Sequence, residues 1–243
     1  MSAAHGENQT ARRGGSGPSG AGGPGAYSDT RERLIEAASR LLSGGGPDAV
    51  TMRKVGELAG VSRAAPYRHF HDKDDLLRAV ALRSMTMVGN EVAEALPAPD
   101  TPAAEVPEAL RRAFFVYLRD GIDRPEHYRL TFGEHLSYVD GPGVHEAAKS
   151  LIQRCVDAVA QGQCGGAIRA GDPHDMAVLA WSALHGLVTL ATSGHLAHKG
   201  WDTTADGQLA RLVADLVTGL TAREEPDSSA PVIAADVEHS DSD

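Results

Sequence analysis

The sequence has 243 residues, of which 42% are hydrophobic, and its formal net charge is -10. This length fits one large domain or two modest ones, and the composition is that of a globular protein rather than a disordered one. The sequence lacks the roughly 18 consecutive apolar residues of a membrane span, and its N-terminal residues lack the apolar segment of a signal peptide.

The two ends of the chain differ in composition from its middle. Residues 1–27 are of low complexity, with GGSGPSGAGGPG at their centre, and predict a flexible tail. Residues 223–243 are acidic, contain Pro and Ser, and predict a second disordered tail. Between these tails we expect two domains, residues 28–85 and residues 86–222.

The first expected domain contains four helical patterns. The first helix repeats apolar residues at helical spacing and ends at the glycines and proline of 44–47; its apolar residues are Leu34, Ile35, Ala38, Leu41 and Leu42. A second short helix begins after Thr51, which suits an N-cap, and a third begins at Ser62. A fourth begins at Asp72, which stands at capping-box spacing from Asp75, and runs toward Pro97.

The rest of the chain is also helical in pattern. Four prolines between residues 97 and 107 predict a linker at a domain boundary. Beyond them, helical patterns cover about 104–119, 125–138, 143–162, 173–196 and 204–222, separated by glycine and proline. Because no alternating β-branched run is long enough for a sheet, the sequence predicts an all-α fold.

Residues 51–73, TMRKVGELAGVSRAAPYRHFHDK, carry the most informative pattern. Two short helices joined by LAGVS have the proportions of a helix-turn-helix, whose second helix enters a major groove of DNA. Gly60 suits the turn because glycine adopts a left-handed backbone without steric cost. Val61 would fill the angle between the helices, and Ser62 would cap the second one.

The charge distribution permits DNA binding despite the acidic total. Residues 28–83 hold ten Lys and Arg against eight Asp and Glu, whereas residues 84–243 hold eleven against twenty-four. A basic island on an acidic body can bind phosphates locally.

Together these features resemble the DNA-binding domain of the TetR family of regulators. The family pattern is T-x-x-x-V/I-A-x-x-A-G-V-S, then Tyr-x-His-Phe, then a Lys that opens a long helix containing Leu-Leu. This chain supplies Thr51, Val55, Leu58, Ala59, Gly60, Val61, Ser62, Tyr67, His69, Phe70, Lys73, Leu76 and Leu77. The resemblance implies a three-helix DNA-binding domain, a larger helical domain that senses a ligand and dimerises, and repression of a pseudo-palindromic operator by a homodimer.

The resemblance also implies the roles of individual residues. Phosphate contacts are expected from Thr51, Tyr67 and Lys73, with Arg53, Arg68 and His69 as further candidates. Base edges are expected to face Ser62, Arg63 and Ala64, and Arg63 is best suited to the paired acceptors of guanine. Phe70 is expected in the core. Tyr67 as a core residue, and the basic side chains as a merely solvated face, are the alternatives.

Pro66 departs from the family pattern, which has a plain helix former at this position. A proline here removes one backbone hydrogen bond and crowds the carbonyl of Ser62. We therefore expect an altered start of the recognition helix.

In the family, the last two long helices form a four-helix bundle between two copies, and segments 173–196 and 204–222 are their counterparts here. Small and apolar residues in the first of these segments suit close helix packing. Trp181, His185 and Gly186 resemble the C-terminal domain of a family subset named for Trp-His-Gly.

Aromatic and histidine side chains of the larger domain are the candidates for an effector site. They are Phe114, Phe115, Tyr117, Leu118, His127, Tyr128, Phe132, His135, Tyr138, Trp181 and His185. Apolar walls with a few polar anchors predict a small, mainly apolar effector. Core packing is the alternative for each aromatic side chain, and core or interface packing for Trp181 and His185.

Other classes of function find little support in the sequence. It contains no Gly-x-Ser-x-Gly, phosphate loop or His-Glu-x-x-His, so we expect neither an enzyme nor a cofactor. His195 and His198 are spaced for one helix face but lack further metal ligands, so no metal is expected. Cys155 and Cys164 would stand roughly 13 Å apart on one helix, which predicts reduced thiols in the cytoplasm. A helical carrier or enzyme without a DNA role remains the alternative.

Overall fold

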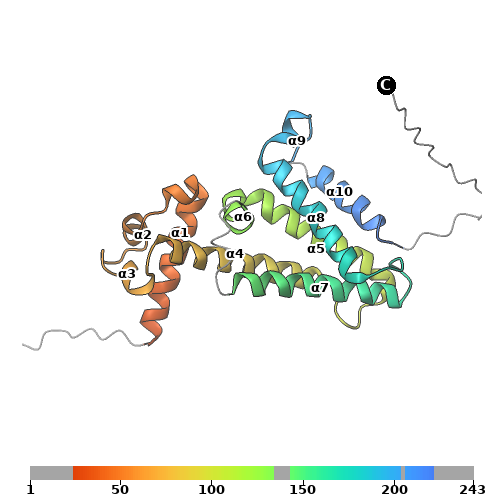
Figure 1. Ribbon diagram of the computed structural model, residues 1–243, viewed down its shortest axis with the longest axis horizontal. Helices are drawn as coiled ribbons and strands as arrows, with labels where there is room; N and C mark the ends of the chain where they lie inside the picture. Colours follow the sequence, from red (N-terminus) through yellow and green to blue (C-terminus); the bar gives the residue numbers. More distant parts are fainter. Residues whose placement is uncertain (1–23, 134–142, 204–205, 222–243) are drawn as a thin grey trace, which may run out of the picture.

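The computed structural model describes residues 24–133, 143–203 and 206–221, and these are largely helical (Figure 1). The helices are α1 (Pro24–Ala49), α2 (Met52–Leu58), α3 (Pro66–His69), α4 (Lys73–Ala95), the short 3-10 helix η1 (Ala103–Glu105), α5 (Val106–Asp123), α6 (Pro125–Phe132), α7 (Val144–Cys164), α8 (Pro173–Thr192), α9 (His195–His198) and α10 (Asp206–Thr218). Within the described ranges there is no strand, only an isolated bridge between Ile168 and Thr221. The predicted all-α fold is confirmed.

α1 begins at Pro24, so Pro24–Tyr27, which we expected in the flexible tail, are helical. Proline suits the first position of a helix because its missing N–H would have no helical partner there. The predicted end of this helix is confirmed, since the backbone leaves helical geometry at Gly45 and Gly46, the latter with a φ of 67°. A last turn containing Pro47 follows this break.

α4 contributes side chains to two separate hydrophobic cores. Its first half buries Leu76, Leu77 and Val80 in a smaller core shared with α1 and α2. Its second half buries Met85, Val88 and Val92 in a larger core shared with α5 and α7. The division between the cores therefore falls inside one continuous helix, which Figure 1 shows running from the α1–α3 end of the molecule into the larger body.

The proline-rich segment after α4 joins two helices of the same core. Val92 before it and Val106 after it both belong to the larger core, so this segment does not separate the two cores as a domain-boundary linker would. Gln161 on α7 stabilises the connection, because its side-chain amide donates to the carbonyls of Ala98 at 2.9 Å and Thr101 at 3.0 Å.

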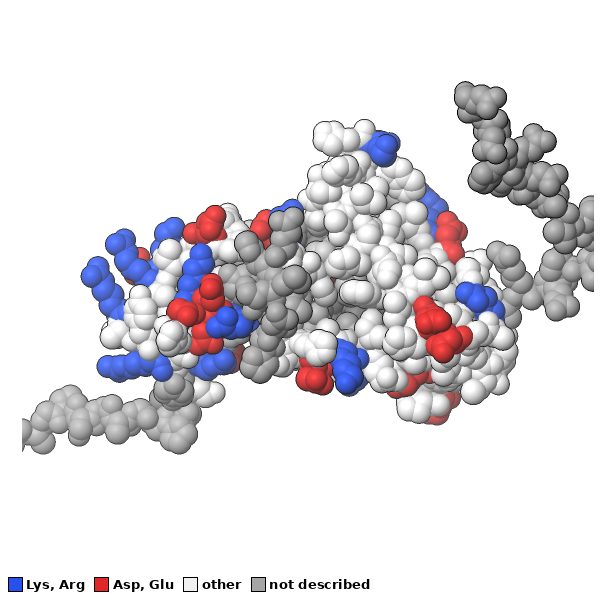
Figure 2. Space-filling view, in the orientation of Figure 1, with Lys and Arg blue, Asp and Glu red and all other residues white. Residues whose placement is uncertain are grey.

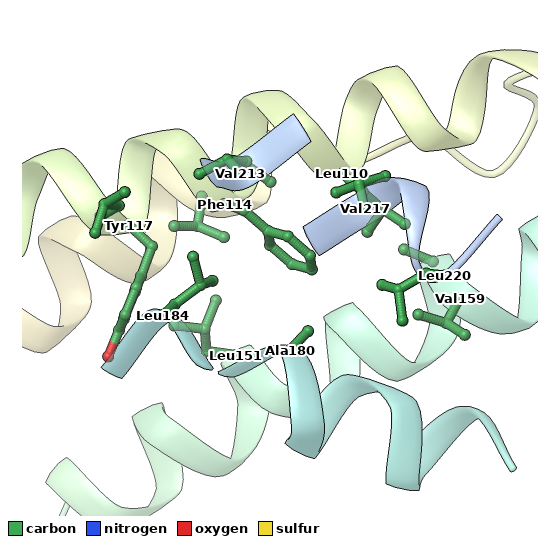
Figure 3. Close-up of a cluster of buried hydrophobic side chains, with 14 of the residues drawn as sticks. Leu110, Phe114, Tyr117, Leu151, Val159, Ala180, Leu184, Val213, Val217 and Leu220 are labelled. Carbon is green, nitrogen blue, oxygen red and sulfur yellow. The ribbon is translucent and has the colours of Figure 1, made fainter. Parts of the chain in front are cut away.

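α5 forms the centre of the larger core. Leu110, Phe114 and Tyr117 recur at helical spacing on its inner face, and Figure 3 shows them pointing toward side chains of α8 and α10. Burial of each such side chain contributes about 1.5–3 kcal/mol. The turn that follows α10 is held by the amide of Arg169, which donates to the carbonyl of Leu220 at 3.0 Å.

Two helical glycines differ in the space around them. A Cβ at Gly121 on α5 would lie 2.7 Å from Cγ1 of Val188, whereas a Cβ at Gly89 on α4 would have no atom within 4 Å. We expect Gly121→Ala to destabilise the protein by about 1–3 kcal/mol through overpacking. Gly89→Ala, the matched control, should stabilise it by roughly 1 kcal/mol because alanine favours the helix. Urea unfolding measures both; a stabilised Gly121→Ala variant would contradict the close α5–α8 packing.

Candidate nucleic-acid interface and pocket

The turn between α2 and α3 has a well-defined backbone. Thr51 is the N-cap of α2, and its side chain accepts from the amide of Lys54 at 3.3 Å. At the other end, Gly60 has a φ of 66°, its amide donates to Glu57, and the amide of Val61 donates to Gly56 at 3.0 Å. This is the Schellman arrangement, in which glycine supplies the left-handed residue. The predicted roles of Thr51 and Gly60 in the local structure are confirmed.

The third helix begins at Pro66, and the expectation that it begins at Ser62 is wrong. Proline has no N–H to donate to the carbonyl of Ser62, so that carbonyl instead accepts from the amide of Ala65 at 3.0 Å. Residues 63–65 form a turn, Pro66 is the first helical residue, and no side chain caps the helix. Ser62, Arg63 and Ala64 therefore precede the helix instead of forming its first turn.

Pro66 packs against α2 through Gly56. Pro66 is buried, and a Cβ at Gly56 would lie 3.2 Å from its Cγ. Gly56 stands where the family pattern has Ala, so the two positions that depart from this pattern contact each other. The missing methyl group makes room for the proline ring.

The structure brings the nine expected DNA-contact residues together at one end of the molecule, on and around α2, α3 and the start of α4. Thr51, Arg53, Ser62, Arg63, Ala64, Tyr67 and Arg68 are exposed, and His69 and Lys73 are half-buried. Tyr67 is 64% exposed, which excludes the alternative that it is a core residue. Phe70 is buried in the smaller core as expected.

Cationic side chains crowd this end of the molecule. Figure 2 shows Lys and Arg gathered over the α1–α3 end, while the face of the larger body seen there is mostly uncharged. Arg53 is paired with Glu57 at 3.2 Å, which reduces its availability. Among the described residues, no ion pair involves Lys54, Arg63 or Lys73. Lys54 is an exposed cation that the motif pattern did not single out, although its charge was visible in the basic island.

α4 begins with the predicted capping interaction. The Asp72 carboxylate accepts from the amide of Asp75 at 2.8 Å, and the Asp75 carboxylate accepts from the amide of His71 at 2.9 Å. The hydrogen bond from the Asp75 amide, followed by one between the His71 ring and the Asp72 carboxylate, lowers the pKa of Asp72. The cap places Lys73 at the first position of α4, beside α3.

Five of the expected effector residues form a connected aromatic cluster between α5, α6 and α8. The Tyr128 hydroxyl lies 2.5 Å from Nδ1 of His185, and the Trp181 indole donates to the Tyr117 hydroxyl at 3.3 Å. The Phe132 ring lies 5.0 Å from the Tyr128 ring and 5.2 Å from the His185 ring. Burial raises the pKa of Tyr128 to about 12, so its hydroxyl stays protonated.

The remaining effector candidates divide into three groups. Phe114 and Leu118 are buried in the larger core, and Phe115 packs against it half-buried. His127 belongs to α6 and contacts Ser39 of α1. His135 and Tyr138 lie outside the described residues.

A pocket of about 290 Å³ opens beside the aromatic cluster. Tyr117, Phe132 and Trp181 line one side of it, and residues of α7 line another. This volume is close to the lower end of the roughly 300–1,000 Å³ typical of small-molecule sites. Within the described residues no group of three or more His, Cys, Asp or Glu side chains is placed to hold a metal.

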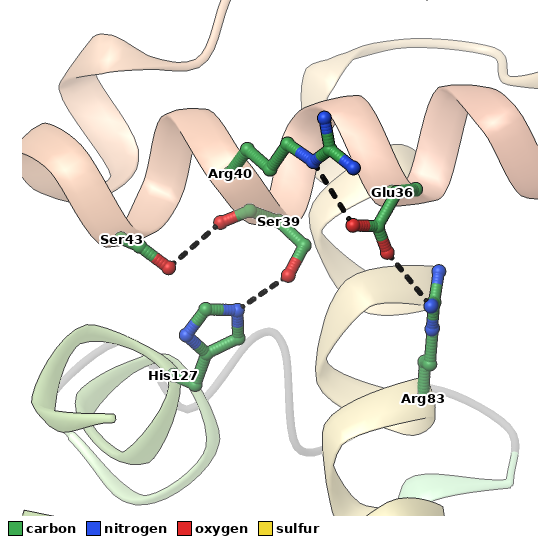
Figure 4. Close-up of polar contacts among 6 residues, drawn as sticks. All are labelled: Glu36, Ser39, Arg40, Ser43, Arg83 and His127. Atoms are coloured by element: carbon green, nitrogen blue, oxygen red, sulfur yellow. Dashed lines mark hydrogen bonds and ion pairs between the residues drawn. The ribbon is translucent and has the colours of Figure 1, made fainter. Parts of the chain in front are cut away.

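His127 connects the larger body to α1. Its Nε2 lies 2.7 Å from the Ser39 hydroxyl, and Figure 4 shows this contact beside the pairing of Glu36 with Arg40 and Arg83. Its Nδ1 is buried without a hydrogen-bond partner among the described residues. Burial, followed by the charge of Arg124, lowers the pKa of His127.

Known proteins match both parts of the chain. The family model described as "Bacterial regulatory proteins, tetR family" matches residues 34–80, and the model described as "Tetracyclin repressor-like, C-terminal domain" matches residues 110–216. The transcriptional activator FasR of Mycolicibacterium smegmatis is 30% identical over 54% of this chain, which spans only 57% of FasR. The transcriptional regulator TtgR of Pseudomonas putida is 27% identical over 66% of this chain and 79% of its own length.

Solved structures share the fold. A protein of unknown function from Rhodococcus sp. RHA1 superimposes with a TM-score of 0.66 at 26% identity, covering 79% of this chain and 95% of its own.

The lowered pKa of His127 predicts a pH dependence of stability. The unfolded chain takes up a proton at this residue at a higher pH than the folded chain does. The stability that the neutral, buried His127 contributes is therefore fully present above pH ~6.5, the pKa of an unperturbed histidine, and is lost as the pH falls below that value. We expect His127→Gln to lose less unfolding free energy than the wild type between pH 7.5 and 5.5. The exposed His198→Gln serves as control, and an unchanged pH slope in His127→Gln would contradict the burial of a neutral His127.

Proposed function

Because the chain belongs to the tetR family of bacterial regulatory proteins and is thus a DNA-binding transcriptional regulator, we propose that it is a homodimeric repressor of a pseudo-palindromic operator. Residues 28–85 are the proposed DNA-binding domain, and residues 86–222 the proposed effector-binding and dimerisation domain. A dimer bound over a promoter would exclude RNA polymerase, and binding of a small effector would release it.

The observation that carries the proposal is the exposed cationic surface around the turn at Gly60. Tyr67 and Arg63 project from a backbone that the Thr51 cap and the Gly60 turn hold in place. We assign phosphate contacts to Thr51, Tyr67 and Lys73, with Arg53, Arg68 and His69 beside them. Ser62, Arg63 and Ala64 are assigned to base edges. Since these three residues lie in the turn before α3, we expect them to reach the groove ahead of the N-terminus of that helix.

α8 and α10 provide the proposed dimer surface. Ala177, Ala180, Leu184 and Val188 on α8 are buried in the chain's own core. Leu179 and Leu190 are exposed at 58% and 43%, and Ala183 and Gly186, at helical spacing between them, are half-buried. On α10, Leu212 and Leu216 are half-buried. An apolar stripe of this kind suits the close approach of a second copy in a four-helix bundle.

The two faces of α8 also indicate where in the cell the protein is found. α8 is long and apolar enough for a membrane span by composition, with a mean hydropathy of 1.2. One face of α8 is buried in the core, and the other is assigned to the second copy, so no face is left for lipid. We infer a cytoplasmic protein that contacts DNA, itself and an effector, and that regulates transcription without catalysing a reaction.

The proposed release of DNA follows from a shift between two conformations. An effector that favours one arrangement of α4 and α6 changes the separation of the two α3 helices in the dimer. DNA binding weakens when this separation no longer matches grooves one turn, about 34 Å, apart.

Fluorescence anisotropy tests the DNA proposal. The full chain is titrated onto its own upstream intergenic duplex and onto a scrambled duplex across a salt series. We expect two chains per site, a preference for the native duplex and a steep loss of affinity with salt. Equal or absent binding to both duplexes would favour a helical carrier, and turnover of a small molecule would favour an enzyme. A promoter reporter that rises when the protein is deleted supports repression, and one that falls contradicts it.

Three variants test the assigned contacts. Tyr67→Phe and Lys73→Ala should weaken binding to every duplex, because phosphates carry no sequence information. Arg63→Ala should also relax the preference at one base pair, with a loss of about 1–3 kcal/mol. Lys199→Ala, at the end of α9 and outside the assigned DNA-contact residues, is the control for loss of one charge. An unchanged base preference in Arg63→Ala would show that this side chain is misplaced in our proposal.

A charge placed on the outer face of α8 tests the dimer surface. We expect Leu179→Glu to convert the dimer to a monomer and to reduce operator affinity at least tenfold, because one half-site retains only half of the contacts. Thr86→Glu, an exposed position on α4, is the control. Sedimentation equilibrium measures the mass, and a dimeric Leu179→Glu variant would move the interface away from α8.

A further inference from the structure

The pocket of about 290 Å³ has an apolar wall built from five helices. Met85 of α4, Tyr117 of α5 and Leu151 of α7 are buried, and Phe132 of α6 and Trp181 of α8 are half-buried beside them. The Tyr117 hydroxyl, the main polar atom on this side, accepts from the Trp181 indole at 3.3 Å. Because the indole N–H is used in this bond, the wall presents mainly aromatic and aliphatic surface to a ligand.

The rim of the pocket is basic. His145, Lys149 and Gln153 follow at four-residue spacing on α7, so they lie along one face of that helix, and His174 joins them from the start of α8. None of the described residues that line the pocket is Asp or Glu. Lys149 is exposed and makes no ion pair with any described residue.

We propose that this pocket binds a small carboxylate with an apolar, preferably aromatic, body, whose anionic end pairs with Lys149. The proposal rests on the proposed function, since this ligand would be the effector. A single ammonium group matches a monoanion, whereas a dianionic phosphate calls for several cations or an arginine fork. The apolar body packs against the wall of Tyr117, Phe132 and Trp181, and the positive charge of Lys149 at the rim disfavours cationic ligands.

Trp181 provides a direct measurement of occupancy. The chain contains two tryptophans, so Trp201→Phe leaves Trp181 as the sole emitter when excited at 295 nm. The probes are 4-phenylbutanoate and 4-phenylbutan-1-ol, which share the apolar body and differ in the charged end. We expect saturable changes in emission with both probes and tighter binding of the carboxylate by about fivefold, as expected for one exposed ion pair. This difference should shrink at high salt.

Lys149→Gln in the Trp201→Phe background separates charge from packing. We expect it to remove the preference for the carboxylate while leaving the affinity for the alcohol unchanged. Lys199→Gln removes the same charge away from the pocket and should retain the preference. Equal affinity for the two probes before the Lys149 change, an equal loss for both probes in Lys149→Gln, or the absence of saturable binding would each overturn the proposal.

Binding to DNA is measured separately by anisotropy on the same samples. If the chain binds its operator but fails the probe experiment, only the ligand class is wrong. If it binds the carboxylate through Lys149 but shows no preference for any duplex, the ligand site is supported and the regulatory function is not.

Discussion

α4 is buried in two hydrophobic cores at once, and this constraint ties the DNA-facing end of the molecule to its larger body. The helix has 23 residues and is therefore about 35 Å long. Lys73 is its first residue, Leu77 belongs to the smaller core, and Val88 belongs to the larger one. Because the helix is continuous between the cores, a tilt of its second half carries the first half with it. In the proposed mechanism, a change at the pocket, where Met85 forms part of the wall, would reach the α2–α3 surface through this helix.

α6 provides a second connection of a different kind. Leu130 belongs to the smaller core and Tyr128 to the larger one, although both lie on the same short helix. His127 adds a polar contact to Ser39 of α1. Packed cores switch between discrete arrangements instead of deforming continuously, so a helix that is packed in two cores tends to move as a unit. The aromatic cluster is thus connected to α1 through α6, which carries both Tyr128 of the cluster and His127.

Charge is divided between the two parts of the molecule in a way that suits local binding of DNA. The net charge of -10 opposes non-specific coating of DNA over a wide surface. At the α1–α3 end, Lys54, Arg63 and Lys73 form no ion pair with any described residue, so these three cations remain available to phosphates. The acidic surplus of the larger body orients the protein, because only the small end is attracted to the duplex.

Local sequence was enough to predict most of the helices, the Thr51 and Asp72 caps, the turn at Gly60 and the family, because each depends on residues close together in the chain. It also revealed that Pro66 would disturb the third helix, although only the structure shows Gly56 making room for the ring. Tertiary structure alone decided which face of α8 is buried, since its small and apolar residues occur all round the helix. It also decided that Lys149 rims a pocket while Phe114 fills a core. Periodicity tells which residues share a face of a helix, and the packing of distant helices decides what covers that face.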